Sequence, residues 1–252
     1  MTEKIGDVRE KIQAAALEEL PALFQQYEMD GRAGVQAALE QGKKRILAYE
    51  KEKARCQALW KYEREYADYV HICGIDEVGR GPLAGPVVAG AVILPKDCDI
   101  LYINDSKKLS EKKREELYDV IMERAVAVGI GCSTPERIDE INILQATYEA
   151  MRQAVAQLPV QPDLLLNDAV TIPELSVRQV PIIKGDAKSI SIGAASIMAK
   201  VTRDRLMVQY DEIYPEYGFA SNKGYGAQVH IEALKKYGPC PIHRKSFITH
   251  FC

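Results

Sequence analysis

Two short apolar runs in the middle of the chain constrain its fold most strongly. Val70–Asp76 and Pro86–Leu94 are rich in β-branched residues and flank a segment rich in glycine and proline. This pattern is typical of two adjacent strands joined as a hairpin. The residues before Val70 instead place apolar side chains at helical spacing. The chain is therefore predicted to divide into a helical N-terminal extension, residues 1–68, and a sheet-containing domain, residues 69–252.

Further along the chain, predicted strands alternate with predicted helices. Additional strands are expected over residues 125–132, 162–168 and 178–183, and residues 99–103 are a candidate for one more. Helices are expected over residues 110–123, 134–158, 187–214 and 227–237. Breaks at Pro21 and at Asp30-Gly31 divide the N-terminal extension into three helices. Antiparallel strands followed by alternating strands and helices predict an α/β fold in which helices flank a mixed sheet.

Composition sets broad limits on the class of protein. Hydrophobic residues make up 47% of the chain and charged residues 27%, which suits a globular protein with a sizeable core. No apolar run approaches the roughly 18–20 residues of a membrane span, so we expect no membrane partner. The first residues are charged rather than apolar, and the six cysteines include no C-x-x-C pair. We therefore expect a cytoplasmic protein whose thiols are reduced.

Charge gives only a weak indication of a nucleic-acid partner. The formal net charge is −3, but residues 216–252 carry five Lys or Arg against two acidic residues. A basic cluster of this kind is either an electrostatic footprint for nucleic acid or a solvated helix face. The pattern alone leaves both interpretations open.

Three aspartates occupy positions that are unusual for an acid. The chain has no phosphate-binding loop, no H-E-x-x-H and no G-x-S-x-G motif, which turns attention to these acids. Asp76 lies in the first predicted strand, Asp168 ends a Leu-Leu-Leu strand, and Asp186 precedes the long helix. Asp168 could begin a turn and Asp186 could cap its helix. Asp76 has no such explanation, because a carboxylate in an apolar strand needs a partner such as a cation.

If these acids converge at one end of the sheet, they form an all-oxygen metal site. Neighbouring carboxylates repel one another unless a cation neutralises them, and oxygen ligands favour Mg²⁺ or Mn²⁺. Two such ions could support phosphodiester hydrolysis. Glu77 follows Asp76 directly, so the two side chains should point to opposite faces unless the strand bends. Gly79 and Gly81 make such a bend plausible.

Four blocks of the sequence resemble the ribonuclease HII family, in the family's order. The first block, residues 74–94, begins Gly-Ile-Asp-Glu-Val-Gly-Arg-Gly-Pro-Leu-Ala-Gly. The others are Asp-Ser-Lys-Lys-Leu-Ser at 105–110, the segment 184–200 that begins Lys-Gly-Asp-Ala-Lys-Ser, and Asn-Lys-Gly-Tyr-Gly at 222–226. The resemblance spans roughly residues 70 to 248. It implies a ribonuclease H-like fold with a five-stranded mixed sheet flanked by helices and a helical C-terminal part.

The resemblance also implies which residues act. The catalytic and metal-binding acids are expected to be Asp76, Glu77, Asp168 and Asp186. Contacts to the substrate are expected from Gly79, Arg80, Gly81, Lys107, Lys184, Ser189 and Tyr225. Among these, the Gly-Arg-Gly loop would approach the ribonucleotide through its backbone. Tyr225 would pack on the sugar that follows it.

The activity implied by the resemblance is that of a metal-dependent endoribonuclease. It would use Mg²⁺ or Mn²⁺ in a two-metal site to hydrolyse the RNA strand of RNA–DNA hybrids. It would also cut 5′ to ribonucleotides embedded in duplex DNA, leaving 3′-hydroxyl and 5′-phosphate ends. These nucleic acids are the expected partners of a monomeric protein.

A phosphatase for small molecules could use the same acids, but it would have no use for the Gly-Arg-Gly loop and Tyr225. Two further alternatives remain open at this point. The first is a nuclease like ribonuclease HIII, against which the helical extension and Asp186 argue. The second is a module that binds hybrids without cutting them. The presence of all four acids argues against that module.

Overall fold

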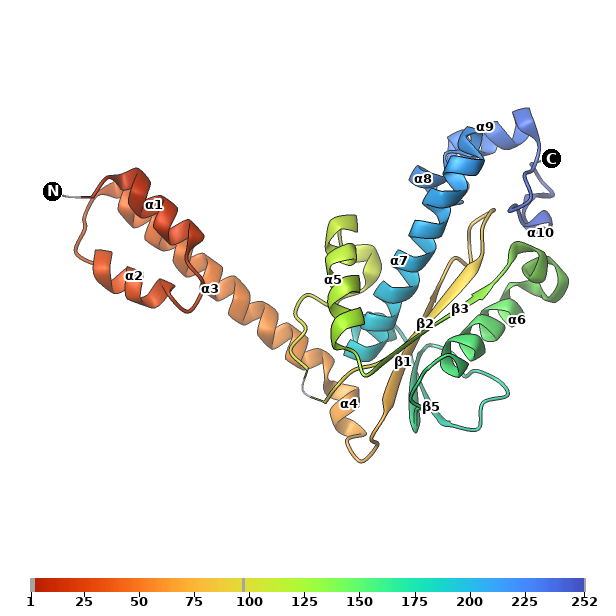
Figure 1. The fold of residues 1–252 in the computed structure, drawn as a ribbon, viewed down its shortest axis with the longest axis horizontal. Coiled ribbons are helices and arrows are strands. Elements are labelled where there is room, and N and C mark those ends of the chain that lie inside the picture. Colours follow the sequence, from red (N-terminus) through yellow and green to blue (C-terminus); the bar gives the residue numbers. More distant parts are fainter. Residues whose placement is uncertain (1–2, 97, 252) are drawn as a thin grey trace. The chain divides into compact units, whose positions relative to one another are not determined.

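The computed structural model describes residues 3–96 and 98–251, and the chain divides into two compact units between Gln57 and Ala58 (Figure 1). The N-terminal unit contains α1 (Ile5–Ala14), α2 (Leu20–Tyr27) and most of α3 (Ala33–Leu59). These are the three helices predicted from the breaks in the sequence. They form a small apolar core of their own, in which Val8, Leu20 and Val35 are fully buried.

The second unit is built on one five-stranded sheet. Its strands are β1 (Ile72–Val78), β2 (Val87–Ile93), β3 (Ala127–Ser133), β4 (Leu164–Asp168) and β5 (Arg178–Ile182). They lie in the order β3-β2-β1-β4-β5. The β1–β2 and β2–β3 pairs are antiparallel, whereas the β1–β4 and β4–β5 pairs are parallel. The predicted mixed sheet is thus confirmed.

The candidate strand at residues 99–103 is wrong. This segment is a loop, and both edges of β2 are already paired, with β1 and with β3. Ile100 and Ile103 are nevertheless buried, in the core between the sheet and its neighbouring helices. Their apolar character therefore comes from core packing and not from a sheet.

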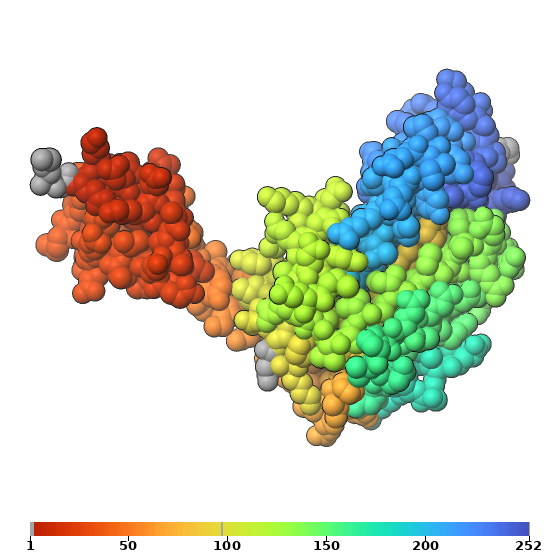
Figure 2. Space-filling view, in the orientation of Figure 1, coloured from red at the N-terminus to blue at the C-terminus, as the bar shows by residue number. Residues whose placement is uncertain are grey.

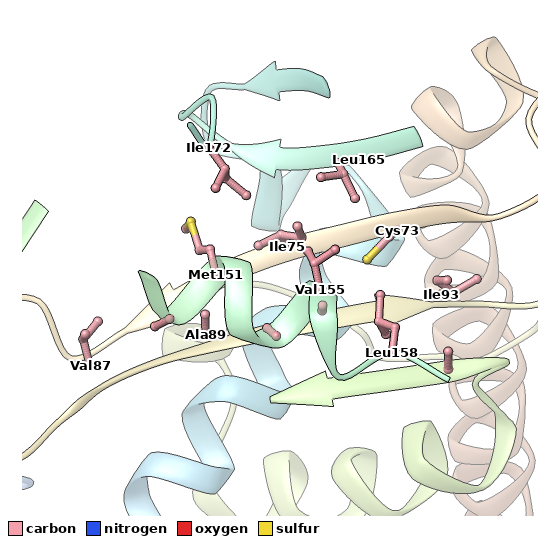
Figure 3. Packing of buried hydrophobic residues seen from close by; sticks show 14 of the residues in the cluster. Cys73, Ile75, Val87, Ala89, Ile93, Met151, Val155, Leu158, Leu165 and Ile172 are labelled. Atoms are coloured by element: carbon pink, nitrogen blue, oxygen red, sulfur yellow. The ribbon is translucent and has the colours of Figure 1, made fainter. Parts of the chain in front are cut away.

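Helices cover both faces of the sheet. The helices of the second unit, including the short 3-10 turns η1–η3, are α4 (Lys61–Glu65), η1 (Ser106–Lys108), α5 (Glu111–Arg124), α6 (Pro135–Ala156), η2 (Gly185–Ala187), α7 (Ile190–Ile213), η3 (Pro215–Tyr217), α8 (Phe219–Asn222), α9 (Gln228–Tyr237) and α10 (Lys245–Ile248). Figure 3 shows Val155 of α6 beside Ile75 of β1, and Met151 of α6 belongs to the same buried cluster. Helices α5 and α7 enclose the second core cluster with Val92 of β2. In the space-filling view these helices largely hide the strands (Figure 2).

Helix α7 approaches the sheet closely because two strand residues lack side chains. A Cβ atom on Gly74 would overlap the backbone of Ser191, and one on Gly90 would lie 2.5 Å from the carbonyl oxygen of Ala195. Both distances are shorter than a real Cβ atom shows to a non-bonded heavy atom. The glycines therefore bring the first half of α7 directly onto β1 and β2, beside the position of Asp76.

The second unit begins before the predicted boundary at residue 69. Leu59 and Trp60 are buried against Leu94 and the residues of α5 and α7, so they belong to the core of the second unit. The reason is geometric: helical periodicity continues across the boundary, while the core partner changes. A helical pattern alone does not show which core a helix serves.

Two fully buried arginines hold the loop between β1 and β2. Arg244 donates to the carbonyl oxygens of Gly79 at 2.5 Å, Arg80 at 3.0 Å and Gly85 at 2.8 Å. Arg203 donates to further carbonyl oxygens, of Pro86 and Ala84 in the loop and of Lys223 in the segment that leads to Tyr225. Because each guanidinium carries five donors in a rigid plane, the two side chains fix both segments at once.

A chain of hydrogen bonds also holds the backbone of Tyr225. His230 Nδ1 lies 2.8 Å from the Tyr225 carbonyl oxygen, and His230 Nε2 lies 2.9 Å from His243 Nε2. The backbone N–H of Cys240 donates to His243 Nδ1 at 3.0 Å. One set of neutral tautomers satisfies every link, with the protons on Nε2 of His243 and on Nδ1 of His230. The two imidazoles therefore serve as neutral connectors between Cys240 and Tyr225.

None of the helices in residues 3–96 and 98–251 is sufficiently long and apolar to cross a membrane.

We predict that His243 makes folding stability fall at acid pH. Burial, with a smaller contribution from the neighbouring His230, lowers the pKa of His243 to about 4. The unfolded chain, with a histidine pKa near 6.5, takes up the proton first as the pH falls. The stability that the neutral imidazole contributes is thus present above about pH 6.5 and is lost as the pH falls toward 4. Urea unfolding across this range should show a slope of about 1.4 kcal/mol per pH unit from one proton.

A variant comparison isolates this effect from the carboxyl groups, which titrate over the same range. His243→Gln should flatten the pH profile, whereas His250→Gln, at an exposed position, should leave it unchanged. Parallel profiles for the wild type and His243→Gln would contradict the prediction.

Candidate active site

A cavity of about 290 Å³ lies where β1 and β4 end. Its lining residues come from β1, β4, η1, η2, α7 and the loop after α8. They are Asp76, Glu77, Val78, Ser106, Lys107, Asp168, Asp186, Ser196, Lys200 and Tyr225. All four predicted acids therefore reach one cavity, although they are spread over 111 sequence positions from 76 to 186.

Asp76 is the most deeply buried of the four acids, with a relative exposure of 6%. The parallel ladder between β1 and β4 ends with the pair Ile75 and Asn167, so Asp76 and Asp168 are the next residues on adjacent strands. Burial, and then repulsion from Glu77 and Asp168, raises the pKa of Asp76 well above its usual value. Hydrogen bonds from the Ser196 side chain and from the Glu77 backbone N–H act in the opposite direction. Burial and the neighbouring acids therefore make a negative charge on this carboxyl group costly.

Glu77 lines the same cavity as Asp76, even though it is the next residue on the strand. The strand ends one residue later, at Val78, and Gly79 follows with a φ of +93°, which lets the chain turn away sharply. The Glu77 carboxylate lies 3.4 Å from Arg80 Nη1. Burial raises the pKa of Glu77, while Arg80 lowers it in part. The chain therefore turns just beyond the two acids, while β1 stays in register with β2 through Val78.

Asp168 and Asp186 are linked through the turn η2. The backbone N–H of Gly185 donates to Asp168 Oδ1 at 2.7 Å. Asp186 is the next residue, and burial, followed by repulsion from Asp105 and Asp168, raises its pKa. Lys107 lowers the pKa of Asp186, because its positive charge favours the carboxylate. The hydrogen bond from Gly185 therefore keeps Asp168 next to the turn that carries Asp186, and the two carboxyl groups repel each other.

The Gly-Arg-Gly loop and Tyr225 lie beside the acids. A Cβ atom on Gly81 would lie 3.9 Å from the Tyr225 ring, so the loop and the ring are neighbours. Tyr225 is 42% exposed and lines the cavity, so it is accessible for packing against a substrate. Arg80 is exposed and pairs with Glu77. The backbone of this loop is fixed by Arg244, as described above.

Two further residues predicted to contact the substrate are not among the residues that line the cavity. Lys184 is exposed and has a left-handed backbone, with φ of 57°, at the start of η2, and it is not among the residues that line the cavity. Ser189 is fully buried, caps the N-terminus of α7, and donates its hydroxyl hydrogen to Glu63 at 2.6 Å. The resemblance placed Ser189 at the substrate, but its hydroxyl is used inside the protein.

Sequence reasoning missed three polar residues of the cavity. Ser106 and Ser196 lie with their hydroxyl oxygens 3.0 Å apart, and Lys200 donates to Asp204 at 2.7 Å. Ser196 and Lys200 are four residues apart on α7, so they lie on one helix face. That spacing, in a helix already expected to begin near Asp186, was the available signal.

The donor set fits hard divalent cations that keep some of their water. The acids supply only oxygen, and the raised pKa values of Asp76, Glu77 and Asp186 reflect burial and mutual repulsion that a cation would relieve. Within the described part of the chain, no three His, Cys, Asp or Glu side chains are close enough to form a ready-made cage. Mg²⁺ typically binds through one or two carboxylates, with water and substrate phosphate completing the shell. An open set of acids is compatible with that mode of binding.

Two family models together match nearly the whole chain. The model described as "Ribonuclease HII" matches residues 73–250, and the model described as "Ribonuclease HII N-terminal domain" matches residues 4–67. The first of these contains all four acids and Tyr225. The second covers the N-terminal unit from residue 4 onward and continues past the end of α4.

Individual proteins agree with the family models. A "Ribonuclease HII" of Lachnoclostridium phytofermentans is 62% identical over 248 residues, covering 98% of both chains. The solved ribonuclease H2 of Pyrococcus horikoshii is 30% identical and covers 70% of this chain and 93% of its own, with a TM-score of 0.59. The solved Bst-RNase HIII in complex with Mn²⁺ is 20% identical and covers 67% of this chain and 63% of its own, with a TM-score of 0.52, and it supports the fold alone. The protein belongs to the ribonuclease HII family and is a ribonuclease H-type endonuclease.

Proposed function

We propose that this enzyme cuts the phosphodiester bond on the 5′ side of a ribonucleotide embedded in duplex DNA, and that it also hydrolyses the RNA strand of RNA–DNA hybrids. Water attacks the phosphorus atom, the bond to the 3′ oxygen of the preceding nucleotide breaks, and that oxygen takes up a proton. The products carry 3′-hydroxyl and 5′-phosphate ends. We further propose that the enzyme acts as a monomer in the cytoplasm.

The observation that carries this proposal is the convergence of two kinds of group on one cavity. Four acids lie at the ends of β1 and β4 and on η2, and an exposed tyrosine ring stands beside them against a glycine loop. The acids suit chemistry at a phosphodiester, whereas the ring and the loop suit recognition of a sugar. A phosphatase for small molecules would need the acids but would have no use for Tyr225.

We propose that Asp76, Glu77, Asp168 and Asp186 hold Mg²⁺ or Mn²⁺ during the reaction. When bound, divalent cations supply activation of the attacking water and stabilisation of the leaving oxygen. The chain itself contributes fixed positions for the acids, through the ends of two adjacent strands and the contact between Gly185 and Asp168. Lys107, which lines the cavity, is placed to attract a phosphate group.

Recognition of the ribose is assigned to the Gly-Arg-Gly loop and Tyr225. The 2′-hydroxyl both donates and accepts hydrogen bonds, and it is the group that distinguishes RNA from DNA at a given site. Gly79 and Gly81 let backbone groups approach closely, and Arg244 holds the carbonyl oxygens of this loop in place. The exposed face of Tyr225 can pack against the neighbouring sugar.

The proposed function predicts metal-dependent cutting at a single, defined phosphodiester. The protein should be incubated with duplex DNA that contains one ribonucleotide, with Mg²⁺, with Mn²⁺ and with EDTA, and the ends should be mapped. We expect one cut, 5′ to the ribonucleotide, in the presence of metal only. Cleavage in EDTA, or cutting of long hybrids but never of this duplex, would contradict the proposal.

Asp76→Asn should reduce the cleavage rate by at least about a hundredfold in Mg²⁺, because a neutral amide cannot balance a dication. Binding of the hybrid, measured by fluorescence anisotropy without metal, should change little. Asp119→Asn provides a matched control, since Asp119 is exposed on α5 and outside the cavity. Near-normal turnover of Asp76→Asn would refute the assigned metal site.

Tyr225→Ala should impair cutting at single embedded ribonucleotides more than cutting of uniform hybrids. The loss of packing should amount to about 1–3 kcal/mol, taking base–aromatic stacking as a guide. Tyr225→Phe should retain most activity because it keeps the ring. Tyr237→Ala, which removes an exposed ring at the end of α9, is the matched control. Equal losses on both substrates would mean that Tyr225 has only a structural role.

A further inference from the structure

Glu63 is a buried acid outside the cavity, on the short helix α4. Its relative exposure is 6%, and its Oε1 atom accepts two hydrogen bonds, from the Ser189 hydroxyl at 2.6 Å and from the Ser191 backbone N–H at 3.1 Å. Its other carboxylate oxygen, Oε2, is buried with no hydrogen-bond partner in the described structure. Burial raises the pKa of this carboxyl group. A buried acid with an unpaired oxygen lowers the free energy of unfolding of the protein. We therefore expect a functional reason for its position.

The contacts of Glu63 continue toward the acids of the active site. Ser189 donates its backbone N–H to the Gly185 carbonyl oxygen at 2.8 Å. Gly185 in turn donates its N–H to Asp168 Oδ1 at 2.7 Å, and Asp186 is the following residue. A continuous path of three hydrogen bonds thus joins Glu63 to Asp168 and passes through the turn that carries Asp186.

Other contacts make the end of this path rigid. Ser189 caps α7 by accepting from the Ile192 N–H at 3.3 Å, and Gly74 of β1 lies directly against Ser191. A helix start that is held on two sides does not shift freely. Asp186 lies in the turn η2, three residues before Ser189, so a displacement of the helix start is transmitted to the acid through a short segment.

We propose that Glu63 is a positioning residue for the catalytic pair Asp168 and Asp186, supplied by the segment that the N-terminal family model covers. The inference rests on the proposed metal site, because it concerns two of the acids assigned to it. It also means that the predicted division at residue 68 would remove a group on which the chemistry depends. A simple helix cap would affect stability alone, whereas a positioning residue also affects how the acids respond to metal.

Full-length variants separate these two roles. Glu63→Ala removes both hydrogen bonds, and Glu63→Gln keeps a carbonyl oxygen that accepts both. Glu65→Ala is the matched control, since Glu65 is an exposed acid on the same helix. The measurements are the cleavage rate as a function of Mn²⁺ concentration, hybrid binding without metal, and amide hydrogen exchange over residues 185–192.

The proposal predicts a specific combination of results. Glu63→Ala should lower the saturated rate or raise the half-saturating Mn²⁺ concentration by roughly 10–100-fold, the usual effect of losing a group that supports a metal ligand. Its amide exchange at Gly185 and Ser191 should accelerate, while hybrid binding stays unchanged. Glu63→Gln should stay within about threefold of the wild type, a change smaller than the effect of losing such a group.

Several results would overturn the proposal. One is a folded Glu63→Ala protein with wild-type Mn²⁺ dependence and wild-type exchange. Another is equal damage from the Gln and Ala variants. If Glu63→Ala does not fold, Glu63→Asp decides, because it keeps the acid but withdraws its oxygen by one carbon–carbon bond, and unchanged Mn²⁺ dependence in that variant would refute the role. Inactivity of the wild type in every metal would instead refute the proposed function, while the exchange measurement would still test the contact.

Discussion

The structure depends on keeping several carboxyl groups together in a place where water does not solvate them fully. Asp76 is almost fully buried, and repulsion from Glu77 and Asp168 adds to the cost of its charge. Such a cluster destabilises the fold unless a cation balances it. Three features hold the acids in place against this repulsion. Helix α7 packs closely on β1, the pairing of β1 with β4 continues up to the residues just before Asp76 and Asp168, and Gly185 of η2 donates a hydrogen bond to Asp168. The fold and the proposed chemistry therefore share one physical origin.

A second set of buried polar groups holds the parts of the cavity that are not acids. Arg203 and Arg244 bind carbonyl oxygens of the loop after β1, and Arg203 also binds Lys223, close to Tyr225. The neutral imidazoles of His230 and His243 hold the Tyr225 backbone through hydrogen bonds. Not all basic residues of the C-terminal segment are therefore available to bind nucleic acid. Arg244 is fully buried, and its guanidinium group binds carbonyl oxygens inside the protein. These hydrogen bonds tie the loop after β1 and the segment before Tyr225 to the rest of the domain.

Much of the site could be predicted because its residues conflict with their local surroundings. An aspartate in an apolar strand, as at Asp76, is a visible anomaly. Apolar, β-branched runs located all five strands of the sheet, and the strand at residues 99–103 was predicted in excess. Contacts between residues far apart in the sequence could not be predicted. Ser189 and Glu63 lie 126 positions apart, so no spacing rule joins them, and the serine was assigned to the substrate. The error at residues 99–103 has a similar cause, because an apolar run does not reveal whether its residues pair in a sheet or pack in the core from a loop.

Thermal unfolding with and without divalent metal tests most directly whether the fold holds these acids for a cation. A ligand that binds only the folded state raises Tm by mass action. The account predicts that Mg²⁺ or Mn²⁺ raises the Tm of the wild type above its value in EDTA. It also predicts that Asp76→Asn has a higher Tm than the wild type in EDTA, because repulsion is relieved, and gains little from metal. A wild type that does not respond to either ion, or an Asp76→Asn variant that gains as much as the wild type, would contradict it.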